Sequence, residues 1–91
     1  MKAALWYKAG DIRIEDIPEP SPCAGEVKIK VKWCGICGSD VPRVHGDEAH
    51  YFPIVLGHEF SGVIDEVGAG VERRTGGDHV TVAPLVPCMQ C

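Results

Sequence analysis

The clearest pattern in the chain is the alternation of apolar and polar side chains in Glu26-Val27-Lys28-Ile29-Lys30-Val31-Lys32-Trp33. Successive side chains of a β-strand point to opposite faces of the sheet, so this period of two predicts a strand. Valine, isoleucine and tryptophan also fit a pleated, half-buried surface. The stretch therefore predicts a strand with a solvent-exposed lysine face and a buried apolar face.

Weaker alternation on both sides predicts further strands at residues 3–7, 12–17, 60–67 and 79–83. Glycine-containing turns at 9–11 and 68–70 and a proline-rich break at 18–22 separate these strands. The strands are short and follow one another closely, which is typical of antiparallel sheets.

A short helix is expected at residues 38–44, with Ser39 or Asp40 as its N-cap and Pro42 in its first turn. About six short strands and a single helix, punctuated by glycine and proline, predict a mostly β fold. We expect a small antiparallel barrel or bent sheet rather than a doubly wound parallel sheet.

Length and composition describe one domain rich in turns. The 91 residues are 45% hydrophobic and 24% charged, with 11 glycines and 7 prolines. The formal net charge of −4, with no basic stripe, argues against nucleic acid as a partner. Apolar runs are far shorter than the ~20 residues that span a membrane, and the N-terminus lacks a signal-peptide pattern. We therefore expect a cytoplasmic protein without a membrane partner.

The 5 cysteines, an odd number, favour metal ligation or free thiols over a disulfide framework. Cys34 and Cys37 lie much farther from Cys88 than the ~15–20 residues that separate the pairs of a zinc ribbon. We interpret Cys34 as a small buried apolar residue and Cys23 as a spare thiol.

Cys37 offers a thiol, and His58 and Glu59, which follow it by 21 and 22 residues, offer an imidazole and a carboxylate. Each of the three lies next to the end of a predicted strand. Zinc is bound by such ligands, and a site with about three of them leaves a position open for chemistry. Zinc there would act as a Lewis acid that lowers the pKa of a coordinated alcohol or water. Glu59 fits either a ligand or a carboxylate of the surrounding shell.

Two polar residues after the cysteine extend this hypothesis. The Ser39 hydroxyl can accept a proton and pass it on, because a hydroxyl is both donor and acceptor. Asp40 would orient a ligand histidine through its second ring nitrogen. Both side chains could instead only cap the helix.

These residues carry a resemblance to a known family. The runs 35–40 (GICGSD), 56–62 (LGHEFSG) and 77–80 (GDHV), followed by Cys88-x-x-Cys91, resemble the zinc-dependent medium-chain alcohol and polyol dehydrogenases. Residues 40–43 and 49–59 are most similar to those of galactitol-1-phosphate 5-dehydrogenases. The resemblance implies that residues 1–91 are the N-terminal, GroES-like part of a catalytic domain, a fragment whose NAD-binding Rossmann domain lies beyond residue 91.

The resemblance also implies roles for single residues. Cys37 and His58 would hold a catalytic zinc, with Glu59 on or near it, while Cys88 and Cys91 would be two of four ligands of a structural zinc. The full protein would oxidise a polyol or polyol phosphate with NAD and form a homo-oligomer, and the fragment alone would be inactive. Arg43 is a candidate contact for a substrate phosphate, because its guanidinium suits bidentate binding.

The sequence departs from the family pattern at Pro42, where many relatives have a relay histidine. His45, His50 or solvent would then take over the relay, although these two histidines and His79 are better explained as surface residues. A sorbitol-like or other secondary-alcohol dehydrogenase is the alternative enzyme. An alternative of another class is a non-catalytic, zinc-binding GroES-like module.

Overall fold

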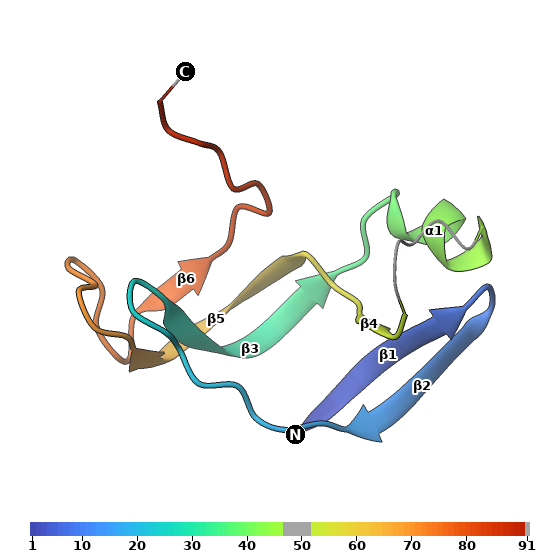
Figure 1. Ribbon diagram of the computed structural model, residues 1–91, viewed down its shortest axis with the longest axis horizontal. Helices are drawn as coiled ribbons and strands as arrows, with labels where there is room; N and C mark the ends of the chain where they lie inside the picture. The colour runs from blue at the N-terminus through green and yellow to red at the C-terminus, as the bar shows by residue number, and fades with distance from the viewer. Residues whose placement is uncertain (47–51, 91) are drawn as a thin grey trace. The chain divides into compact units, whose positions relative to one another are not determined.

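Residues 1–46 and 52–90, the part of the chain that this computed structural model describes, form mainly β-strands (Figure 1). The elements in chain order are β1 (Lys2–Lys8), β2 (Asp11–Asp16), β3 (Val27–Gly35), α1 (Asp40–Gly46), β4 (Ile54–Val55), β5 (Glu59–Val67) and β6 (His79–Thr81). They belong to two compact units: a first unit of Met1–Pro20 with Ile36–Gly57, and a second unit of Ser21–Gly35 with His58–Cys91.

The first unit contains an antiparallel sheet in the order β2-β1-β4. β1 and β2 form a hairpin whose turn includes Gly10, with a φ of 71° that favours glycine. The Gly10 amide donates to the carbonyl oxygen of Val44 at 2.9 Å, which ties the hairpin turn to α1. The helix is thereby fixed to the sheet of its own unit.

Trp6 is the centre of the packing in the first unit. Its side chain is fully buried, and its ring meets that of Phe52 edge-on, with 4.9 Å between ring centroids. Such edge-to-face pairs stabilise beyond their buried area. Ala3 and Leu5 of the same strand are also buried, so β1 supplies most of this core.

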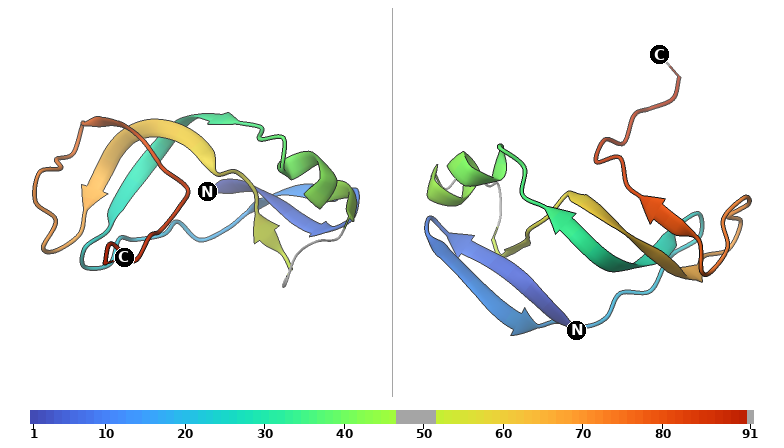
Figure 2. Two further views of the ribbon diagram at one scale, coloured as in Figure 1. Left: turned by 90° about the horizontal axis from the view of Figure 1, so that it is seen from above. Right: turned by 180° about the vertical axis from the view of Figure 1, so that it is seen from behind.

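The second unit contains an antiparallel sheet in the order β3-β5-β6. The ribbons of β3 and β5 run side by side in each view of Figures 1 and 2. Their register extends from Val27 opposite Val67 to Gly35 opposite Glu59. Ile64 of the central strand is the buried apolar residue of this unit, among those the structure describes.

The predicted elements are confirmed in outline. The mostly β, antiparallel character, the strands β1, β2, β3, β5 and β6, and one short helix all occur in the structure. β6 ends at Thr81, two residues earlier than expected, and β4 was not located from the sequence. The helix begins at Asp40, whose carboxylate accepts from the amide of Cys37 at 2.9 Å.

Two expectations about burial are wrong. The apolar face of residues 26–33, expected to be buried, is largely exposed at its end, where Val31 is 52% and Trp33 80% exposed. The β3–β5 register shifts between these two residues, so the strict alternation breaks there, as at a β-bulge. Cys34, expected to be buried, is exposed near the end of the same strand. The alternation in the sequence predicted the strand correctly, but it did not predict which of its side chains are buried.

In the parts of the chain that the structure describes, no helix is long and apolar enough to cross a membrane.

Candidate metal centre

Cys37 lies between the end of β3 and the start of α1, in the first unit. Its side chain is half-buried. Its amide donates to Oδ2 of Asp40 at 2.9 Å, and the Asp40 amide donates back to the carbonyl oxygen of Cys37 at 3.0 Å. This reciprocal pair resembles a capping box, in which a carboxylate bonds the amide three residues before it. The backbone of the candidate thiol ligand is therefore held at both of its polar groups.

Glu59 is the first residue of β5 and His58 immediately precedes it, both in the second unit. His58 is half-buried and Glu59 is exposed. Glu59 is paired with Gly35, and its Oε2 lies 3.0 Å from where a Cβ on Gly35 would stand. The carboxylate therefore rests over a residue that has no side chain.

The β3–β5 register limits how far Cys37 can be from Glu59. Gly35 is opposite Glu59, and Cys37 follows Gly35 by two residues. Paired Cα atoms lie about 5 Å apart and a residue spans at most about 3.6 Å, so connectivity keeps the Cα atoms of Cys37 and Glu59 within about 12 Å. Cys37, His58 and Glu59 carry a thiol sulfur, ring nitrogens and carboxylate oxygens, and each residue offers one ligand atom to a metal ion. This donor set fits zinc.

The remaining predicted site residues are only partly described. Ser39 is exposed in the turn before α1, and Arg43 and His45 are exposed on that helix. Cys88 and His79 are exposed in the second unit, where His79 opens β6. His50 and Cys91 lie outside the described residues, so the expected pairing of Cys88 with Cys91 stays a prediction.

Gly35 is a site residue that the sequence reasoning missed. An alanine there would bring its Cβ within 3.0 Å of the Glu59 carboxylate and 3.5 Å of the Glu59 Cβ. Only the pairing of β3 with β5 reveals this contact, because the two residues are far apart in the sequence. The glycine leaves the space that the Glu59 carboxylate occupies.

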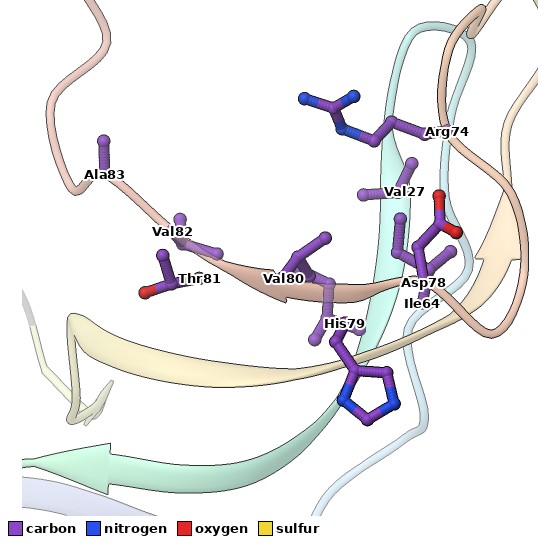
Figure 3. A pocket seen from close by; sticks show the side chains of 10 residues that line it. Val27, Ile64, Arg74, Asp78, His79, Val80, Thr81, Val82 and Ala83 are labelled. Carbon is purple, nitrogen blue, oxygen red and sulfur yellow. The ribbon is translucent and has the colours of Figure 1, made fainter.

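A separate hollow lies on the sheet of the second unit. Figure 3 shows Arg74 and Asp78 on one side of β6 and the ring of His79 on the other. Val27, Ile64 and Val80 are among its apolar lining residues. This lining includes none of the three candidate ligands, so the hollow is distinct from the candidate metal centre.

The chain resembles proteins of established activity. The model of the alcohol dehydrogenase GroES-like domain matches residues 23–91. The chain is 50% identical to (R,R)-butanediol dehydrogenase of Bacillus subtilis, with 93% of this chain and 28% of that protein covered. It is 46% identical to galactitol 1-phosphate 5-dehydrogenase of Escherichia coli K12, with 100% and 27% covered.

A solved structure gives the same picture at the level of the backbone. The thermostable alcohol dehydrogenase from Pyrobaculum aerophilum, determined with cobalt and zinc bound, matches with a TM-score of 0.90 at 35% identity. The match covers 100% of this chain and 29% of that one. The chain thus spans between a quarter and a third of the length of these three proteins.

Proposed function

The chain belongs to the family of alcohol dehydrogenase GroES-like domains, and from this premise we propose that it forms the zinc-binding part of a dehydrogenase. The complete enzyme would oxidise a secondary alcohol of a polyol or polyol phosphate with NAD. The observation that carries the proposal is the β3–β5 register, which sets Glu59 and its neighbour His58 against Gly35, two residues from Cys37. The donor atoms of these residues, and the two-residue step from Gly35 to Cys37, support the binding of one zinc ion by all three.

Cys37 and His58 would hold the zinc, with Glu59 as a further ligand or as a carboxylate beside it. Zinc, when bound, supplies the Lewis acidity that makes an alcohol easier to deprotonate near neutral pH. Ser39 would take up the alcohol proton and pass it to solvent, because its exposed hydroxyl lies in the turn two residues beyond Cys37. Cys88 and Cys91 would contribute to a second, structural zinc.

Substituting Gly35 by alanine is expected to lower zinc affinity about tenfold, as loss of a supporting group does in other metal sites. The new Cβ would stand 3.0 Å from the Glu59 carboxylate, which would have to shift by a few tenths of an ångström. Competition with a chromophoric chelator measures the affinity. Gly38→Ala is the matched control, because a Cβ at Gly38 meets nothing within 4 Å. Equal affinities in the two variants would mean that zinc binding does not depend on the position of the Glu59 carboxylate over Gly35.

Relatives differ in substrate, so phosphate preference is a separate proposal. The two named relatives act, by their names, on butanediol and on galactitol 1-phosphate. Arg43 is exposed on α1, six residues after Cys37, where a guanidinium could bind a phosphate. We therefore favour a phosphorylated polyol, with sorbitol-like substrates as the alternative.

Substituting Arg43 by alanine is expected to raise KM for galactitol 1-phosphate about tenfold while leaving kcat unchanged, since the lost contact binds ground and transition states alike. Steady-state kinetics with NAD in a catalytically active protein that contains this chain measure both constants. Unphosphorylated butanediol is the control substrate, and its KM should not change. An unchanged KM for the phosphate would mean that Arg43 does not contact the substrate.

A non-catalytic, zinc-binding module is the second candidate, because the family match describes a GroES-like domain and that match contains the three candidate ligands. An assay with NAD and with butanediol, galactitol 1-phosphate or sorbitol as substrate distinguishes the candidates. The chain alone is expected to be inactive under both. Activity of the chain joined to an NAD-binding domain would support the dehydrogenase, and zinc binding without activity in that joined protein would favour the module.

A further inference from the structure

The same backbone loop occurs at three places among the described residues. In each, the amide of one residue donates to the carboxylate of the residue three positions later, whose own amide donates back to the first carbonyl oxygen. The pairs are Cys23 with Glu26 at 2.9 and 3.1 Å, Cys37 with Asp40 at 2.9 and 3.0 Å, and Thr75 with Asp78 at 2.9 and 3.1 Å. One of the three holds a candidate metal ligand.

The loop at Cys37 fixes the backbone from which the thiol extends. Cys37 lies beyond the last residue of β3 and before the first residue of α1, so neither element supplies its hydrogen bonds by regular pairing. Asp40 supplies both, through its carboxylate and its amide. A hydrogen bond to a carboxylate is stronger than one between neutral groups. Without it, the direction of the Cys37 side chain would be set only by the neighbouring residues.

We propose that Asp40 is a positioning residue for the Cys37 sulfur, acting through the Cys37 backbone. The inference rests on the proposed zinc site. It differs from the histidine-orienting role expected from the sequence, because the group that Asp40 acts on is the ligand cysteine. In other proteins, substituting a group that supports a metal ligand without touching the metal changes metal affinity by about 10–100-fold, so the effect is large enough to measure.

The experiment compares Asp40→Ala, which removes the acceptor, with Asp40→Asn, which keeps an amide oxygen at the same place. Asp78→Ala is the matched control, since it removes the same loop at Thr75, which contains none of the candidate ligands. Hydrogen exchange of the Cys37 amide reports the bond itself in the metal-free chain. Titration with Co²⁺, followed through the thiolate-to-cobalt absorption band, reports affinity and the cysteine–metal bond.

In Asp40→Ala, the Cys37 amide is expected to lose its protection, Co²⁺ affinity to fall about tenfold, and the thiolate band to weaken. Asp40→Asn should retain most of the affinity. Asp78→Ala should expose the Thr75 amide and leave Co²⁺ affinity within about twofold, because this loop shares no residue with the candidate ligands. If Asp40→Ala does not fold, Asp40→Leu, which has the same branching of heavy atoms and no acceptor, takes its place.

Two results would overturn the inference. In one, the Cys37 amide loses protection and Co²⁺ affinity does not change. In the other, affinity falls while the Cys37 amide stays protected, which would mean that Asp40 acts on another ligand. Failure of the proposed zinc site looks different, because the unsubstituted chain would then show no thiolate-to-cobalt band that depends on Cys37.

Discussion

Substituting Cys37 by serine is expected to lower zinc affinity about a hundredfold or more, the largest effect of any side-chain change in the chain. Loss of groups that only surround a metal costs about 10–100-fold, and loss of a ligand exceeds this. Cys37 would supply the single thiolate of the centre, with His58 and Glu59 as the other candidates. A serine hydroxyl stays protonated near neutral pH and binds zinc poorly, so it does not replace the sulfur.

Cys34→Ser is the matched control for this variant. Cys34 is an exposed cysteine three residues before the half-buried Cys37, and it lies on β3 opposite Phe60. Isothermal titration with zinc, under conditions that keep the thiols reduced, measures both affinities. Equal loss in the two variants would point to a Cys34–Cys37 pair as the ligands, and no loss in Cys37→Ser would remove the cysteine from the site.

Substituting Gly62 by alanine is expected to unfold the second unit or to destabilise it by about 3 kcal/mol or more. A Cβ at Gly62 would stand 2.2 Å from the carbonyl oxygen of Lys30 and 2.9 Å from the side chain of Ile29. Gly62 lies in the central strand, paired with Val31 on one side and Val80 on the other. Backbone atoms cannot yield as a flexible side chain can. Overpacking costs about 1–3 kcal/mol even where side chains can adjust, and small domains are stable by only about 5–15 kcal/mol.

Gly76→Ala is the control, since its Cβ would meet only ordinary contacts at 3.9 Å from the carbonyl oxygens of Ile64 and Asp65. Urea unfolding followed by tryptophan fluorescence and far-ultraviolet circular dichroism measures the free energy of unfolding of each variant. Gly76→Ala should stay within about 0.5 kcal/mol of the unsubstituted chain, as surface substitutions usually do. Equal stability of the Gly62 and Gly76 variants would contradict the register of β3 and β5.

The sequence predicted the strands well where alternation is long, and it predicted the candidate ligands from their chemistry. β4 escaped prediction because two residues carry too little pattern to detect. The exposure of Val31 and Trp33 also escaped it, since a register shift depends on the partner strand and leaves no mark in the period of β3 alone. Burial is a property of neighbours, which the local pattern does not contain.

The arrangement around the candidate ligands shows the same limit. The motif at 35–40 identified Cys37 and Asp40, but the hydrogen bond between the Cys37 amide and the Asp40 carboxylate required the backbone geometry. Likewise, the contact of Glu59 with Gly35 follows only from the pairing of two strands. Residue chemistry was therefore readable in the sequence, whereas the contacts that support it were not.

The zinc content of the purified 91-residue chain tests the central claim most directly. Elemental analysis after dialysis should give about one zinc per chain, the stoichiometry of a single site built on Cys37, His58 and Glu59. That zinc should persist in Cys88→Ser and disappear in Cys37→Ser. A chain without zinc, or zinc that is lost with Cys88 and retained without Cys37, would contradict the proposed metal centre.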